Sequence, residues 1–134
     1  MYETNQQWAY AAPPGYEASR IIIGAIVSWG KNERVICASV TGAPRREPNG
    51  GIAAVTIPFL PMTEAAFSKT VTELDGRADP AAGFASAFTE WSNDQRGLSV
   101  FTVQFDGFLD RFIARQMAEI VSPQQARHSA EQHP

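Results

Sequence analysis

The side chains best suited to binding chemistry stand in one short stretch, residues 42–51. Arg45 and Arg46 lie there between two prolines that limit the freedom of the backbone. A guanidinium group binds a carboxylate or a phosphate through a fork of N–H donors, and a stiffened segment loses less entropy on binding. Arg45 and Arg46, with Arg96, are therefore the candidates for binding a small anion or a partner, and a plain solvated loop is the competing interpretation. The stretch lacks the glycine and lysine spacing of a phosphate-binding loop.

Two carboxylates, Asp106 and Asp110, are the candidates for acid–base catalysis. They stand four residues apart at the start of the last expected helix, which places them on a shared face. Two nearby carboxylates can serve as acid and base, or can hold Mg²⁺ with water. A structural role competes with this interpretation, because Asp106 is also suited to cap the helix and acidic residues in a first turn favour the helix dipole.

Histidine and cysteine chemistry is not expected from the folded part of the chain. The two histidines, His128 and His133, stand in the polar C-terminal stretch, where neither can be held rigidly beside a nucleophile. The single cysteine, Cys37, stands within an apolar segment, whereas a reactive thiolate needs a positive and partly exposed setting. We expect a packed core cysteine, no metal site and no cofactor.

The segment 20–42 must supply the centre of the fold, because it contains two apolar runs joined by a polar turn. Residues 20–29 and 34–41 are predicted to pair as strands of a hairpin, with residues 30–33 as the turn. Residues 51–57 are expected to form a third strand that stops at Pro58.

Three helices and one further strand are expected after the hairpin. Thr63 is predicted to cap a helix that ends near Gly76, and Asp79 is predicted to cap a second one. The alternating segment 98–105 predicts a fourth strand, and Asp106 opens the last helix. The apolar stripes that define the first two helices are Phe67, Val71 and Leu74, and then Phe84, Phe88 and Trp91.

Early strands and late helices predict an α+β domain with a mostly antiparallel sheet and helices packed on one face. The order along the chain is then β-β-β-α-α-β-α. We expect a flexible N-terminal arm over residues 1–19, one domain over residues 20–121 and a disordered tail over residues 122–134.

Aromatic and branched residues predict a partner surface. The first strand is apolar on both sides, and large aromatic side chains are favoured as interface anchors. We expect association, as a homodimer, with a second copy of the chain. The expected interface residues are Trp29, Ile22, Ile26, Trp8 and Tyr10.

Composition bounds the remaining possibilities. The chain has 134 residues, is 44% hydrophobic and carries a net charge of −3, which suits one globular domain. Basic residues outnumber acidic ones between residues 20 and 60, and acidic residues outnumber basic ones between residues 61 and 121. The sequence lacks the dense basic stripe that is typical of nucleic-acid binding, so we do not expect that function. No apolar run is long enough to span a membrane, and one cysteine fits a cytoplasmic protein.

Three functional hypotheses follow. The first is a small non-catalytic module that binds a protein partner or a small anionic ligand. The alternative is a histidine-free enzyme, an isomerase, lyase or Mg²⁺-assisted enzyme, in which Asp106 or Asp110 moves a proton and an arginine holds the substrate. The third is an accessory or inhibitory subunit that docks by strand addition, with the segment 1–19 folding on the partner.

Overall fold

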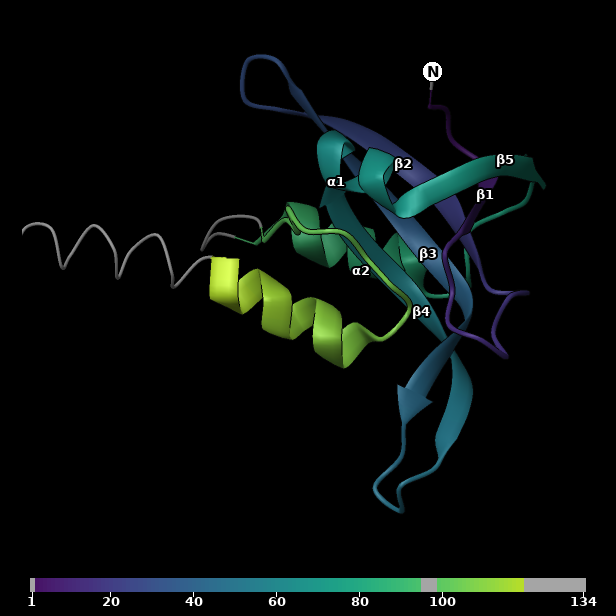
Figure 1. The fold of residues 1–134 in the computed structure, drawn as a ribbon. Helices are drawn as coiled ribbons and strands as arrows, with labels where there is room; N and C mark the ends of the chain where they lie inside the picture. Colours follow the sequence, from purple (N-terminus) through teal and green to yellow (C-terminus); the bar gives the residue numbers. More distant parts are fainter. Residues whose placement is uncertain (1, 95–98, 120–134) are drawn as a thin grey trace, which may run out of the picture.

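A curved, five-stranded antiparallel sheet forms the centre of the computed structural model, which describes residues 2–94 and 99–119. The strand order across the sheet is β4-β3-β2-β1-β5, so β4 and β5 form its two edges (Figure 1). An α+β class with an antiparallel sheet is therefore confirmed. The elements are β1 (Gln6–Tyr10), β2 (Arg20–Trp29), β3 (Glu33–Arg46), β4 (Ile52–Thr63), α1 (Glu64–Thr70), β5 (Val71–Arg77), α2 (Phe84–Ser92) and a C-terminal helix described over residues 109–119.

The predicted central hairpin is confirmed as β2 and β3. Their pairing runs from Arg20 opposite Thr41 to Trp29 opposite Glu33, with one irregularity between Ile23 and Ala25. The runs of isoleucine and valine explain this pairing, because branched side chains pack well on a pleated surface that is covered on both sides.

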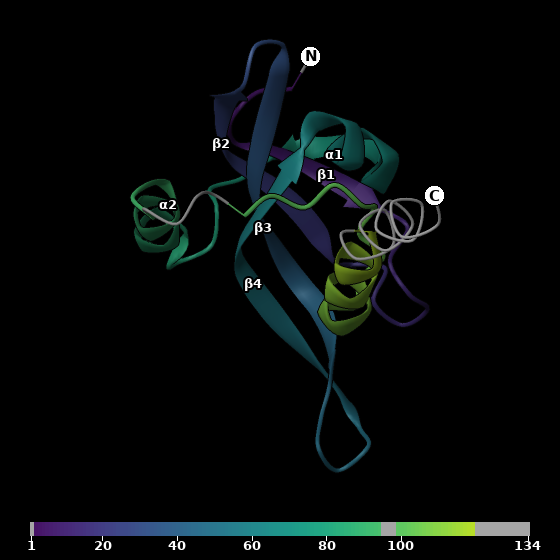
Figure 2. The ribbon, with the colours of Figure 1, turned by 90° about the vertical axis from the view of Figure 1, so that its left-hand side faces the viewer.

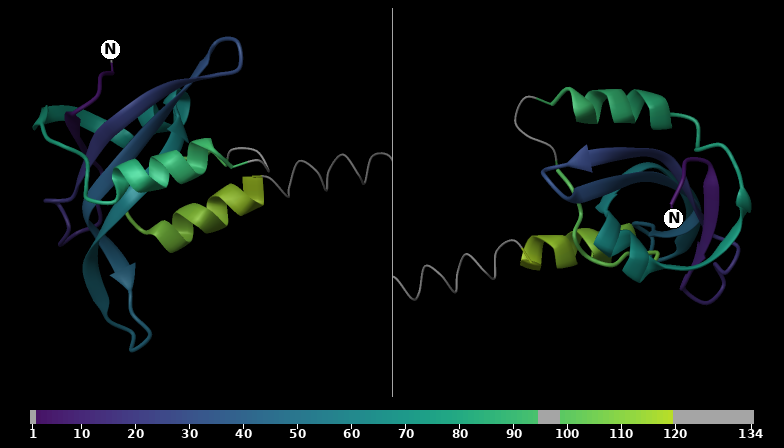
Figure 3. Two further views of the ribbon diagram at one scale, coloured as in Figure 1. Left: turned by 180° about the vertical axis from the view of Figure 1, so that it is seen from behind. Right: turned by 90° about the horizontal axis from the view of Figure 1, so that it is seen from above.

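Side chains of the hairpin alternate between two separate cores, one on each face of the sheet. Ile36, Ala38 and Val40 belong to the larger core, which α1 and the C-terminal helix cover. Val35 and Cys37 belong to the smaller core, which α2 covers with Phe84. Figures 2 and 3 show α2 and the C-terminal helix on opposite sides of the strands. Helices thus lie on both faces, where the sequence pattern indicated one.

The irregular N-terminal arm is a wrong prediction at its centre, because Gln6–Tyr10 forms β1. This short strand lies inside the sheet and pairs with both β2 and β5. The sequence of β1 shows no alternation of apolar and polar residues, because the polar Gln6 occupies a buried position. Its Oε1 accepts hydrogen bonds there from the Glu3 N–H and the Trp8 indole N–H.

The third strand is longer than predicted. β4 continues through Pro58 and Pro61 to Thr63, because it is an edge strand and a proline there costs no hydrogen bond to a neighbour. Its antiparallel partner β3 is also longer than predicted, because it continues past Thr41 to Arg46 and places Arg45 opposite Ala53. Arg45 and Arg46 therefore lie on a strand rather than on a loop.

The first predicted helix is right at its start and wrong at its end. The Thr63 hydroxyl accepts a hydrogen bond from the Ala66 N–H at 3.2 Å, so the predicted cap is confirmed. However, α1 ends at Thr70, and the chain continues as edge strand β5. Successive β-branched residues from Thr70 to Thr72 favour this change, and Leu74 pairs with Trp8 across the sheet.

The remaining predictions need three corrections. Gly83 caps α2 in place of Asp79, whose carboxylate instead accepts a hydrogen bond from Asn5. The described part of segment 98–105 makes only an isolated parallel bridge, between Phe101 and Met62. Asp106 lies in the turn before the C-terminal helix, where its Oδ1 accepts a hydrogen bond from the Phe108 N–H at 3.3 Å.

Candidate functional site

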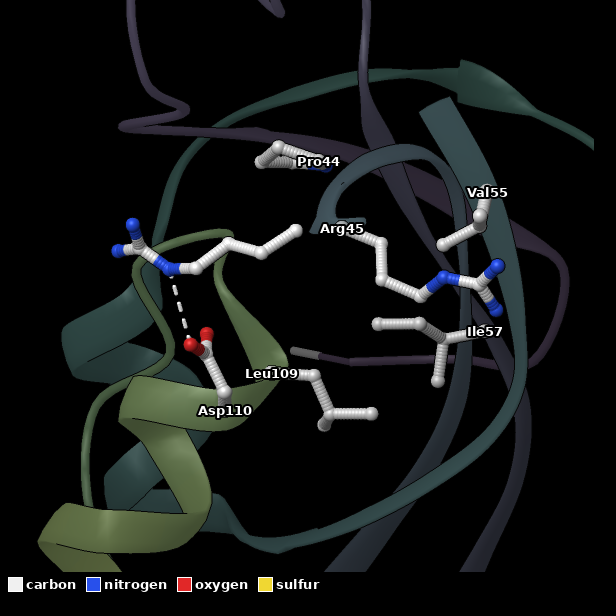
Figure 4. A pocket seen from close by; sticks show the side chains of 7 residues that line it. Pro44, Arg45, Val55, Ile57, Leu109 and Asp110 are labelled. Carbon is white, nitrogen blue, oxygen red and sulfur yellow. Dashed lines mark hydrogen bonds and ion pairs between the residues drawn. The ribbon is translucent and has the colours of Figure 1, made fainter. Parts of the chain in front are cut away.

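A small pocket lies between the far end of the β3–β4 hairpin and the start of the C-terminal helix. Its volume is about 180 Å³, and most of its surface is apolar. Figure 4 shows side chains from the two strands and the helix around this hollow. The lining residues are Pro44, Arg45, Arg46, Val55, Ile57, Leu109 and Asp110.

An ion pair between strand and helix closes one side of this hairpin–helix pocket. The Arg46 Nε lies 2.9 Å from the Asp110 Oδ2, and both side chains are more than half exposed (Figure 4). The Arg46 guanidinium also lies over the Phe108 ring, 4.6 Å from its centroid. An exposed ion pair contributes only about 0.2–1 kcal/mol, so we interpret these contacts chiefly as positioning the wall of the pocket.

Arg45 differs from Arg46 because its ion pair is longer and its side chain is more exposed. Adjacent strand residues point to opposite faces, so the two side chains diverge from neighbouring positions. The Arg45 side chain is 63% exposed, and its contact with Glu47 is long, at 3.6 Å. Arg45 therefore offers a hydrogen-bonding fork at the rim of an apolar hollow.

The two candidate carboxylates do not form a pair. Asp110 lines the pocket, whereas Asp106 does not and is held by Arg115 at 3.0 Å and Arg111 at 3.5 Å. Asp110 shares the pocket with Arg45 and Arg46, two of the three predicted arginines, which is the juxtaposition that an enzyme of the histidine-free kind requires. Its carboxylate pairs with Arg46 at 2.9 Å and is more than half exposed to solvent, so this setting lacks the burial and the free partner that an acid–base group needs.

Contacts among arginine and phenylalanine side chains hold the start of the C-terminal helix beside the pocket. The Phe108 ring is buried and carries the Arg111 guanidinium at 4.4 Å as well as that of Arg46. Arg115 extends this cluster by donating to the Gln104 carbonyl oxygen. These contacts fix the first turn of the C-terminal helix, and with it the positions of Leu109 and Asp110.

The predicted interface residues lie elsewhere, and two of them are unavailable. Ile22 is 3% exposed and Tyr10 is 6% exposed, so the chain itself covers both. The Tyr10 hydroxyl lies 2.7 Å from the Ser19 hydroxyl, and burial raises the pKa of this phenol. Trp8 packs edge-on against Phe67, and Ile26 is half-buried against the larger core.

Two predicted residues cannot be placed in the site. Arg96 lies outside the described residues, and of Trp29 the structure describes only the backbone, at the end of β2.

The cysteine prediction agrees with the structure. Cys37 is fully buried in the smaller core, and burial raises the pKa of its thiol to about 12. A thiol with such a pKa is protonated at neutral pH and is a poor nucleophile.

Sequence reasoning missed the apolar lining, namely Val55, Ile57 and Leu109. The first two fall in the predicted strand 51–57, and the third falls in the last predicted helix. No local pattern could identify them as a site, because the hollow forms only where the end of a long hairpin meets a helix about 50 residues later in the chain. The exposed side of that helix was also missed: Ile113 is 45% and Met117 is 54% exposed.

Comparisons with known proteins give no independent indication of function. No protein-family model, no curated protein and no solved structure matches this chain.

None of the helices among residues 2–94 and 99–119 is both long and apolar enough to cross a membrane.

Proposed function

We propose that this protein is a non-catalytic binding module, and that the hairpin–helix pocket is its site for a small organic anion. One observation carries the proposal: a concave, apolar hollow has the exposed guanidinium of Arg45 at its rim. Small-molecule sites commonly combine an apolar lining with a few polar groups that orient the ligand.

The side chains around the pocket support binding more than catalysis. Among the described lining residues, Asp110 is the one group that could exchange a proton, and Arg46 already pairs with it. No hydroxyl, thiol or imidazole stands among these residues to act as a nucleophile or base. The enzyme hypothesis therefore stays the weaker prediction.

Thermal denaturation with a panel of organic anions tests the proposal. A ligand at about 100 times its dissociation constant stabilises the folded state by about 2.7 kcal/mol, which raises Tm by several degrees. We expect this rise in the wild type and its loss in Arg45→Gln. Arg77→Gln is the matched control, because Arg77 is equally exposed, at 61%, and lies on β5. Equal shifts in all three proteins would contradict the assignment of the site.

A second candidate function is self-association through the C-terminal helix. Ile113 and Met117 stand four residues apart and expose about half of their side chains on one helix face. Exposed apolar side chains grouped in this way are typical of an interface, and a second copy remains the partner that we predict. A cytoplasmic location likewise stays a prediction.

Light scattering coupled to size-exclusion chromatography measures this association directly. We expect a molar mass that rises with concentration toward a dimer, and a monomer for the Ile113→Ser/Met117→Ser variant. Ile52→Ser is the control, because Ile52 is similarly exposed, at 47%, but lies at the start of β4. A wild-type protein that is monomeric at every concentration would rule out the dimer.

A further inference from the structure

We propose that the hairpin–helix pocket takes a short, branched aliphatic monocarboxylate, an inference that rests on the function proposed above. The size of the pocket sets the first limit. A cavity of about 150 Å³ accommodates benzene, and this one has about 180 Å³. Pockets for drug-sized ligands begin at about 300 Å³, so the part of a ligand that lies inside this one is smaller than a nucleotide or a sugar phosphate.

The lining sets the second limit, on the body of the ligand. Val55, Ile57 and Leu109 present branched aliphatic groups, and Pro44 adds a further apolar wall. A polar group placed among them would lose its hydration without gaining a hydrogen bond, which is unfavourable. The part of the ligand inside the pocket is therefore aliphatic, and its polar group stays at the rim.

The charges at the rim set the third limit, on the head group. Arg45 provides one guanidinium, whose ion pair with Glu47 is long, at 3.6 Å. Arg46 is committed to Asp110 at 2.9 Å and to the Phe108 ring. The more loosely paired fork of Arg45 matches one carboxylate, because its two N–H donors are spaced to meet the two oxygens.

Asp110 excludes more highly charged ligands. Its carboxylate lines the same pocket, so a second negative charge on the ligand would meet a like charge across a short distance. A dicarboxylate or a phosphate dianion is disfavoured for this reason, whereas a single carboxylate offsets the net positive charge of the three charged lining residues, Arg45, Arg46 and Asp110. The ligand class is thus defined by a small aliphatic body and one negative charge.

NMR titration of the full-length protein, with isotope-labelled methyl groups, tests this inference. The probe is 4-methylpentanoate, and its neutral analogue is 4-methylpentanamide; inorganic phosphate and succinate are the competing anions. We expect 4-methylpentanoate to shift the methyl resonances of Val55, Ile57 and Leu109. The amide should bind at least about tenfold more weakly, because it lacks the charge-assisted hydrogen bonds to Arg45.

Three variants separate the contributions. Arg45→Gln should weaken binding of the carboxylate about tenfold and leave binding of the amide unchanged. Val55→Phe should abolish binding of both probes by filling the hollow, and Arg77→Gln should change neither affinity. Circular dichroism confirms that each variant is folded, which we expect for Arg45→Gln because this side chain is 63% exposed.

The outcomes distinguish this inference from the function on which it rests. If phosphate or succinate shifts these methyl resonances and 4-methylpentanoate does not, the ligand class is wrong and the binding function stands. If none of the four probes shifts them, the inference and the proposed small-anion site are both overturned. If Arg45→Gln binds the carboxylate as tightly as the wild type does, the role given to Arg45 is wrong.

Discussion

Replacement of Gly24 by alanine should destabilise the fold by displacing α2 from the sheet. Gly24 lies at the irregularity in β2, and the Phe84 ring packs directly over it. A Cβ atom added there would lie 2.4 Å from the Phe84 Cζ, far inside the optimal carbon–carbon separation of about 3.5–4.0 Å. The backbone of Gly24 lies outside the left-handed region, so the expected cost comes from this overlap.

The size of the effect follows from how firmly Phe84 is held. The ring is 6% exposed and packs against Phe59 and Phe88, so it cannot move by an ångström without disturbing them. Overpacking of a core costs about 1–3 kcal/mol, and the lower entropy of the unfolded alanine chain offsets about 0.4–1 kcal/mol. We expect a net loss of about 1–2 kcal/mol, or about 4–8 °C in Tm.

Thermal and urea denaturation, followed by circular dichroism, measure this loss. Phe84→Leu shortens the opposing side chain, so the double variant should lose less stability than the sum of the two single changes, by about 1 kcal/mol. Gly51→Ala is the control, because a Cβ there meets only the Asn49 side chain in an exposed turn. Unchanged stability in Gly24→Ala, or strict additivity in the double variant, would refute the reasoning.

Three further predictions concern local features of the fold. Thr63→Ala should lose about 1 kcal/mol of stability in thermal denaturation, because the cap of α1 disappears, and Thr63→Ser should restore it. Cys37 should resist iodoacetamide at pH 8 in the folded protein and should react with it in denaturant. Because folding raises the pKa of this thiol to about 12, the free energy of unfolding should also fall above pH 9, where the thiol ionises in the unfolded chain only. Hydrogen bonds from Arg34 lower the pKa of Glu64 below its ordinary value of 4.5, so Glu64 contributes stability above that pH and loses it as the pH falls through the lower folded value. Denaturation midpoints of wild type and Glu64→Gln should therefore converge in acid, and a constant difference would argue against this ion pair.

The sequence determined those features whose signal is local. The central hairpin was predictable because two long runs rich in branched residues flank a short polar turn. The cap at Thr63 was predictable because it depends on one side chain and a backbone N–H three residues later. The burial of Cys37 was predictable from the apolar character of its own strand.

Tertiary structure decided the features that depend on distant neighbours. Residues 6–10 and 71–77 become strands because each supplies the other with a partner across the sheet, and neither pattern indicates that pairing alone. Pro58 remains within β4 because that strand lies at an edge, which only the order of strands determines. Topology outweighed local pattern at these positions.

The candidate site divides in the same way. The arginines and Asp110 were recognisable from the sequence, because charged groups in a constrained setting stand out locally. Their meeting was not, since it requires the end of a long twisted hairpin to reach a helix that follows much later in the chain. The apolar lining looked like ordinary core in the sequence, because a branched side chain has the same character whether it faces a packed interior or a hollow. Only the packing of the hairpin against the helix separates these two environments.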